Sequence, residues 1–241
     1  MHSLGQNEIH LWYQDLESPH LQSLTKAQIG LLNSEETKRF EAFKVPWKQK
    51  EYWATRVLTR TVLSQYLSTS FESLKFIENS FGRPELFSTL ENAPLQFNIS
   101  HCEGLLVCAV TLEGKLGVDV EDIKQIESLT GIAQRHFSAK EFADLLKQSQ
   151  EKQHKRFFEY WTLKEAYIKA KGKGLAIPLD NFSFELSQPG SIIFSADPTI
   201  ECDPADWQFR LHRPTERHQM ALAFRQIGAT HFKIVEHWNL L

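Results

Sequence analysis

Residues 96–121, QFNISHCEGLLVCAVTLEGKLGVDVE, decide the fold of this chain. Residues 96–110 and 116–121 are rich in β-branched and other apolar side chains, which favours β-strands. The Glu113-Gly114 pair between them predicts an antiparallel hairpin. Segments with helical periodicity flank these strands on both sides, so we expect an α+β fold.

The expected helices carry start and stop signals. Helical periodicity runs over residues 34–67, and the Val45-Pro46 step should divide it into two helices. Further helices are expected from about Ser128, from about Ser138 and over residues 150–171, the last ending at Gly172. Residues 182–186, 207–212, 220–224 and 232–236 then have the apolar pattern of strands.

A faint internal repeat indicates two similar halves. Tyr52-Trp53 and Tyr160-Trp161 each open a helical segment, and the apolar residues 105–110 have a counterpart in 220–224. Chance similarity of amphipathic helices and apolar strands would give the same pattern. If the repeat is real, residues 1–114 and 115–241 form two halves with a cleft between them, joined near residues 113–117.

The composition excludes several classes of protein. The 27 basic and 30 acidic residues give a net charge of -3, which provides no reason to expect nucleic-acid binding. The sequence has neither a signal peptide pattern nor an apolar run long enough to span a membrane, so we expect a cytoplasmic protein, and a monomer. Cys102, Cys108 and Cys202 are widely spaced and predict neither a disulfide framework nor a zinc site.

Two carboxylates in the segment Gly117-Val118-Asp119-Val120-Glu121 could bind a metal ion. On a strand, Asp119 and Glu121 project from one face, and the two valines project from the other. Oxygen ligands without a nearby Cys or His favour magnesium, or manganese, over zinc. The alternative is a solvated strand face with no ligand.

A third carboxylate lies in the helix expected over residues 150–171. Glu165 falls on the apolar side of that helix, which is defined by Phe157, Phe158, Trp161 and Ile168. A buried carboxylate needs a partner, and a metal ion would supply one. Lys164 and Lys169 flank this side and could hold phosphate oxygens. The alternative is a salt bridge from Glu165 to Lys169.

Two further segments carry groups that could bind an anion. Asn98, Ser100 and His101 end a strand-like segment with groups able to bind phosphate or ribose oxygens. Adjacent residues on a strand point to opposite faces, so Ser100 and His101 do not form a hydrolase nucleophile and base. In the turn Gly82-Arg83-Pro84, glycine lets the backbone approach a ligand and arginine can meet an anion.

These segments together resemble one family, the Sfp-type 4′-phosphopantetheinyl transferases. The resemblance covers about residues 35–186 and rests on residues 81–84, 97–101, 117–121, 137–142, 161–169, 172–175 and 178–179. The last three follow in the family's order and spacing as WTLKEAYIK, GKGL and PL.

The resemblance implies an enzyme that moves phosphopantetheine from coenzyme A to a serine of an apo acyl or peptidyl carrier protein, in fatty acid, polyketide or nonribosomal peptide synthesis. It implies two α+β halves related by a pseudo-two-fold axis, with coenzyme A between them and the metal site in the C-terminal half. It makes Asp119, Glu121 and Glu165 the magnesium ligands, and Glu165 also the base. Lys169 and Lys164 would contact the phosphates, Ser100 and His101 would lie near the 3′-phosphate, and Gly82, Arg83 and Pro84 near the adenine. Asn98 would also contact the coenzyme.

One region departs from the family pattern. Basic residues before the first long helix help to hold the 3′-phosphate in well-known members, and the nearest matches here include Asn33, Glu36 and Glu51. The candidates to replace them are Lys38, Arg39, Lys50 and Arg56.

Two alternative functions stay open from the sequence, as does the placement of one segment. The chain could bind coenzyme A without turnover, or use acyl-CoA as the donor of an acyl group. Residues 123–134 could present Ile126, Leu129 and Ile132 as an exposed apolar strip for a carrier helix, or these residues could face the core.

Overall fold

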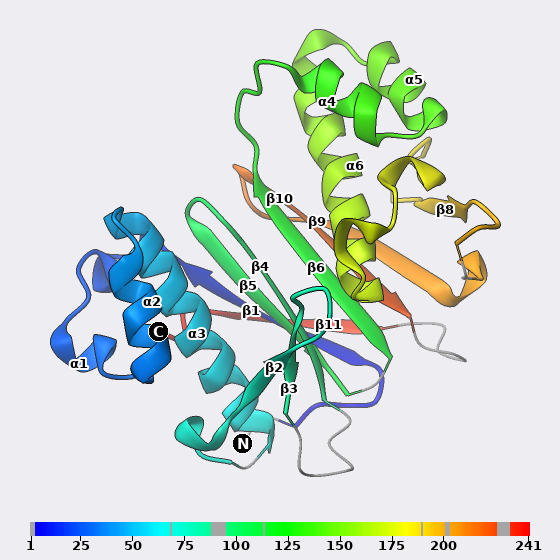
Figure 1. Cartoon of the computed structure of the whole chain (residues 1–241). Coiled ribbons are helices and arrows are strands. Elements are labelled where there is room, and N and C mark those ends of the chain that lie inside the picture. The colour runs from blue at the N-terminus through cyan, green and yellow to red at the C-terminus, as the bar shows by residue number, and fades with distance from the viewer. Residues whose placement is uncertain are drawn as a thin grey trace.

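The computed structural model describes residues 3–67, 69–87, 95–112, 114–188, 190–200, 203–225 and 232–241. Two sheets form its centre, and a long helix packs on each (Figure 1). The first sheet has the order β11 (Lys233–Trp238), β1 (Glu8–Asp15), β5 (Leu105–Thr111), β4 (Gln96–Cys102). The second has the order β6 (Lys115–Asp122), β10 (His218–Arg225), β9 (Trp207–Thr215). This architecture confirms the expected α+β class.

Smaller hairpins lie beside these sheets. One pairs β2 (Phe76–Glu78) with β3 (Pro84–Leu86), and the other pairs β7 (Phe182–Glu185) with β8 (Ile193–Ala196). Single 3-10 turns occupy Pro19–Leu21, Phe71–Ser73, Gly174–Ala176, Leu179–Asn181 and Pro204–Asp206.

The helices follow the signals in the sequence. They are α1 (Lys26–Ile29), α2 (Ser34–Ala42), α3 (Pro46–Leu67), α4 (Leu129–His136), α5 (Ala139–Lys147) and α6 (Gln150–Lys171). Pro46 begins α3, where its missing N–H costs no hydrogen bond. Ser138 caps α5, and Gly172 ends α6 at a φ of 68° that glycine adopts without strain. Within the described ranges, no helix is long and apolar enough to cross a membrane.

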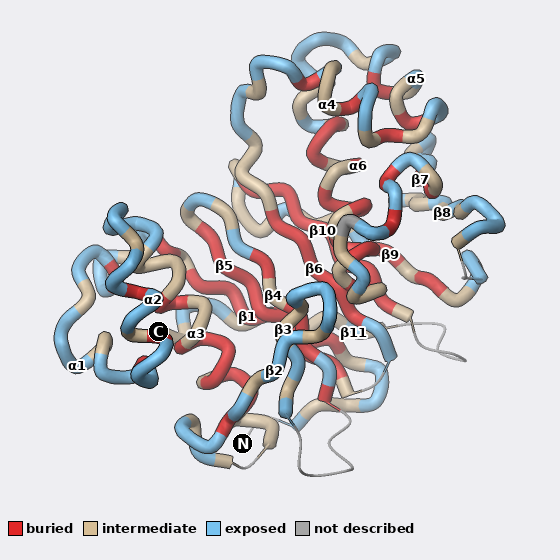
Figure 2. The backbone as a smooth tube through the Cα atoms, viewed as in Figure 1, coloured by how far each residue is buried: buried red, intermediate tan, exposed pale blue. Residues whose placement is uncertain are grey.

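Three apolar cores stack through the molecule, as the buried segments in Figure 2 show. One lies between α3 and the first sheet, and one lies between α6 and the second sheet. The third lies between the two sheets, and alternate residues of β1, β5, β6 and β10 fill it. On β6, Val118 and Val120 enter this shared core while Asp119 and Glu121 stay on the other face, as the strand alternation predicted.

One expectation from the sequence is wrong, and one open alternative is decided by the structure. The hairpin expected at Glu113-Gly114 forms instead between β4 and β5, whereas β6 pairs with β10 in the second sheet. Glu113 itself lies outside the described residues, as does Cys202. The apolar strip over residues 123–134 is not exposed: Leu129 is buried, and Ile126 and Ile132 pack against the same core. Burying that side of α4 removes more apolar surface from water than leaving it for a partner would.

Contact between β6 and α6 is close because Gly117 has no side chain. A Cβ atom at Gly117 would lie 2.0 Å from the Ala166 carbonyl oxygen and 2.5 Å from the Ala170 backbone nitrogen. Ala166 and Ala170 are themselves small and buried. The helix can therefore lie directly on the strand that carries Asp119 and Glu121.

A buried ion pair fixes α6 at its other side. The Lys164 ammonium donates to Glu141 Oε2 at 2.8 Å and to the carbonyl oxygens of Leu179 and Phe182, and both charged side chains have 0% exposure. Glu141 also accepts from the backbone N–H groups of Ser138 and Phe184. This network ties α5, α6 and β7 together.

We expect Gly117→Ala to destabilise the fold by at least about 3 kcal/mol, because backbone atoms, unlike side chains, cannot move aside. Thermal unfolding followed by circular dichroism measures this. Gly30→Ala is the control, since Gly30 has a φ of -63° and a Cβ there would meet its nearest atom at 3.3 Å. Equal stability of both variants would contradict the close packing described here.

Lys164→Met should cost about 3–5 kcal/mol of unfolding free energy, because it leaves the Glu141 carboxylate buried without a cation. Lys155→Met removes the same charge from an exposed position of α6 and should have little effect. Urea unfolding compares the two. The double variant Glu141→Gln/Lys164→Met should lose less than the sum of the single variants, and additive losses would refute the coupling.

Candidate metal and coenzyme site

Three carboxylates and an ammonium lie near enough to interact electrostatically where α6 lies on β6. Asp119 and Glu121 come from β6, and Glu165 and Lys169 come from α6, one residue before Ala166 and Ala170. The contact at Gly117 therefore brings both pairs to the same place. Glu165 is half-buried rather than enclosed, as is Trp161 one turn earlier, and the Trp161 indole donates to Glu121 Oε1 at 3.2 Å.

Asp119 has one satisfied oxygen and one unsatisfied oxygen. Its Oδ1 accepts from Lys169 Nζ at 2.6 Å and from Ser100 Oγ at 3.0 Å. Its Oδ2 is buried without a hydrogen-bond partner. A buried carboxylate oxygen that nothing satisfies is costly, so a ligand at this position would stabilise the site.

The carboxylates repel one another in a partly dry environment. Burial, followed by the charge of Asp119, raises the pKa of Glu121 to about 7 and that of Glu165 to about 7. Burial also raises the pKa of Asp119, and Lys169 opposes that shift. Among the described residues, no three Asp, Glu, His or Cys side chains lie close enough together to hold a metal ion in this conformation. The unsatisfied Asp119 Oδ2 and the all-oxygen donor set nevertheless fit a hard divalent cation.

Asn98 and Ser100 connect the two sheets. Asn98 Oδ1 accepts from the Val118 backbone N–H at 2.9 Å, and Ser100 Oγ accepts from the Val120 backbone N–H at 3.2 Å. These side chains satisfy backbone groups at the edge where β6 lies against β4. The resemblance implies a place near the 3′-phosphate for Ser100, whereas the structure puts Ser100 beside Asp119 and Lys169.

His101, the next residue on β4, faces a different space. It lines a cavity of about 390 Å³ between α3 and the β2–β3 hairpin. His101 Nδ1 lies 3.4 Å from Glu51 Oε2 on α3. Positive charges in the lining come from Arg39, Lys48 and Arg56. Of the four basic residues proposed from the sequence, Arg39 and Arg56 thus reach this cavity, and Lys48 is an addition that the sequence reasoning missed.

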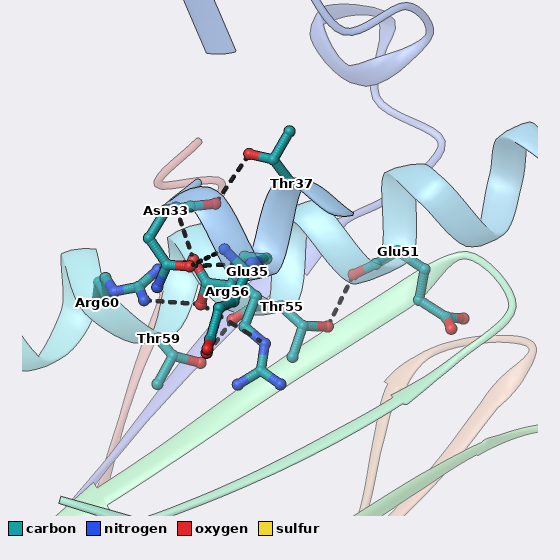
Figure 3. Close-up of polar contacts among 9 residues, drawn as sticks. Asn33, Glu35, Thr37, Glu51, Thr55, Arg56, Thr59 and Arg60 are labelled. Atoms are coloured by element: carbon teal, nitrogen blue, oxygen red, sulfur yellow. Dashed lines mark hydrogen bonds and ion pairs between the residues drawn. The ribbon is translucent and has the colours of Figure 1, made fainter. Parts of the chain in front are cut away.

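Arginines on α3 have separate roles, as the close-up in Figure 3 shows. The Arg60 guanidinium is buried and binds both oxygens of Glu36, at 2.7 and 2.9 Å. Glu36 also belongs to the cap of α2 with Asn33. Arg56 lies 3.9 Å from Glu36 and keeps 29% side-chain exposure, so its charge is available to the cavity.

Gly82, Arg83 and Pro84, where the chain enters β3, have different surroundings. Gly82, at a φ of 81°, and Pro84 line the cavity. The Arg83 guanidinium instead donates to the carbonyl oxygens of Lys169 and Ala170 at the end of α6, and to those of Phe97 and Leu116. Arg83 therefore holds the hairpin against the C-terminal end of α6. The negative end of the helix dipole there also favours a cation.

Lys164 does not reach the site. Its ammonium is fully buried on the other side of α6, and its donors are used by Glu141 and two backbone carbonyls. The sequence pattern predicts that both lysines flank the side of the helix that carries Glu165. In the structure, Lys164 instead points into the core, because each residue turns by about 100° around the helix. We therefore leave Lys164 out of the phosphate contacts.

Comparisons with known proteins find matches to one superfamily along most of the chain. The family described as "4′-phosphopantetheinyl transferase, N-terminal" matches residues 18–113, and the "4′-phosphopantetheinyl transferase superfamily" matches residues 115–223. The 4′-phosphopantetheinyl transferase HetI of Nostoc is 35% identical over 174 residues, covering 72% of this chain and 73% of its own length. The 4′-phosphopantetheinyl transferase Sfp of Bacillus subtilis is 35% identical over 173 residues, covering 67% of this chain and 75% of its own.

Among solved structures, a holo-[acyl-carrier-protein] synthase from Thermotoga maritima aligns at 21% identity and a TM-score of 0.38, over 46% of this chain and 62% of its own. The family assignment does not depend on that alignment, because the two sequence relatives are each covered over more than two thirds of their length. The chain belongs to the 4′-phosphopantetheinyl transferase superfamily.

Proposed function

We propose that this protein transfers the 4′-phosphopantetheine group of coenzyme A to a serine of an apo acyl or peptidyl carrier protein. The observation that carries the proposal is the meeting of Asp119, Glu121, Glu165 and Lys169 between β6 and α6. The cavity lined by His101 is close enough to this cluster for His101 to interact electrostatically with Asp119.

In this reaction the serine oxygen bonds to the β-phosphorus, and the bond from that phosphorus to the bridging oxygen breaks. Adenosine 3′,5′-bisphosphate leaves. Magnesium, or manganese, held by Asp119, Glu121 and Glu165 would offset the charge that develops on the pyrophosphate. Glu165 would accept the serine proton, directly or through water.

Coenzyme A would extend from the cavity to the carboxylates. Its adenosine end would occupy the cavity beside Gly82, Pro84 and His101, with Arg39, Lys48 and Arg56 attracting the 3′-phosphate. Lys169, which keeps 30% side-chain exposure, would turn toward the pyrophosphate. Asn98 and Ser100 would support this arrangement by fixing the position of β6 relative to β4 through their hydrogen bonds.

The proposal includes two halves, residues 1–114 and 115–241, with a pseudo-two-fold axis and the coenzyme cleft between them. Support comes from α3 and α6, each of 22 residues and each packed on one sheet, and from the core that the sheets share. One strand crosses this division: β11 comes from residues 115–241 but pairs with β1 in the first sheet. We also propose that the enzyme is a monomer in the cytoplasm and binds neither nucleic acid nor membranes.

Mass spectrometry of an apo carrier domain, incubated with the protein, coenzyme A and magnesium, tests the function. The carrier should gain the mass of phosphopantetheine. Asp119→Asn should lower turnover about 100-fold or more, because it removes one charged ligand of the metal ion that would stabilise charge in the transition state. An unmodified carrier would favour coenzyme A binding without turnover, and a carrier with only an acyl mass would favour an acyltransferase. Turnover of Asp119→Asn within a few-fold of the parent would refute the metal assignment.

His101→Ala should weaken binding of coenzyme A by about 1.5–3 kcal/mol, the scale of a hydrogen bond to a charged group. Binding of dephospho-coenzyme A, which lacks the 3′-phosphate, should change much less. Calorimetry with both ligands measures the difference, and His20→Ala, at an exposed position outside the cavity, is the matched control. An equal loss for both ligands would give His101 a structural role through Glu51.

A further inference from the structure

The Lys169 ammonium occupies a defined position beside Asp119 and Ser100. It donates to Asp119 Oδ1 at 2.6 Å and to Ser100 Oγ at 2.8 Å. Ser100 in turn donates to the same Asp119 oxygen at 3.0 Å and accepts from the Val120 N–H. The hydroxyl proton and both acceptor positions of Ser100 are thus used, so this triangle is a built structure rather than a chance surface contact.

Asp119 is the point at which two cations would meet. Its side chain has 5% exposure, and Lys169 is the cation that neutralises it. The other oxygen, Oδ2, is buried and has no partner. A divalent ion bound at Oδ2 would stand within a few ångströms of the Lys169 ammonium, and like charges repel strongly where water is largely excluded.

We propose that Lys169 is the internal counter-ion of the metal-free site and that it competes with the divalent ion for Asp119. Ser100 holds the ammonium in this position. When the ion binds, the Lys169 ammonium leaves Asp119 Oδ1 and becomes free to meet a coenzyme phosphate. This inference rests on the metal site of the proposed function, but it concerns the protein before any coenzyme arrives.

The competition predicts a gain of metal affinity when the lysine is removed. Titration of Mn²⁺ without coenzyme, followed by electron paramagnetic resonance, should show binding about tenfold tighter in Lys169→Met than in the parent, the usual scale of coupling between two ligands. Lys169→Arg keeps the competing charge and should retain weak binding. Lys155→Met removes a charge from the exposed part of the same helix and should match the parent.

A second measurement uses the parent alone, in case Lys169→Met folds poorly. The lysine side-chain ammonium signal assigned to Lys169, by its loss in Lys169→Arg, should shift or exchange faster with water when Mg²⁺ is added. An unchanged signal at saturating Mg²⁺ would overturn the competition, as would Mn²⁺ affinity in Lys169→Met that is equal to or weaker than in the parent.

Carrier modification by the same parent preparation separates the two hypotheses. If the parent modifies the carrier and Lys169→Met gains no affinity, only the role of Lys169 fails. If neither protein binds Mn²⁺ and the carrier stays unmodified, the metal site and the counter-ion role both fail.

Discussion

The close contact of β6 with α6 at Gly117 is the constraint on which the site depends. Any side chain there would strike the backbone at Ala166 and Ala170. Glu165 and Lys169 immediately precede these alanines, while Asp119 follows Gly117 by two residues on the same face of the strand. A shift of helix against strand by a single residue would therefore separate the two carboxylates of β6 from the charges of α6. Steric contact at Gly117 lets the helix approach the strand, and the Lys169–Asp119 ion pair and the Trp161–Glu121 hydrogen bond then join the two elements.

Polar residues around the site divide into those that position and those that remain available for chemistry. Lys164 with Glu141, and Arg83 with the carbonyl oxygens at the end of α6, fix the helix from two directions. Asn98 and Ser100 fix β6 against β4. Each of these groups is satisfied by the protein itself. Asp119 Oδ2 differs because it is buried and has no hydrogen-bond partner, which is the observation that supports the proposed ligand position there.

The carboxylates near Asp119 cost folding stability, because burial and mutual repulsion disfavour their charged forms. Burial and mutual repulsion raise the pKa values of Glu121 and Glu165 to about 7, so these carboxylates are held in an environment that disfavours their charge. Lys169 offsets part of this cost through Asp119. Concentrating these charges costs folding stability, and the proposed divalent cation would offset that cost.

Local sequence determined the boundaries of the long helices, through Pro46, Ser138 and Gly172, and the shared face of Asp119 and Glu121, through the two-residue period of a strand. It also carried the motifs of the family. Only the tertiary structure decided that β6 joins β10 rather than β5, and that β1 and β11 pair across the chain, because pairing between distant strands leaves no local signal. The same holds for Lys164, Arg83 and Leu129, which motif and periodicity placed at a ligand or a partner. Their partners come from segments far apart in sequence, and burial against those segments decides their role.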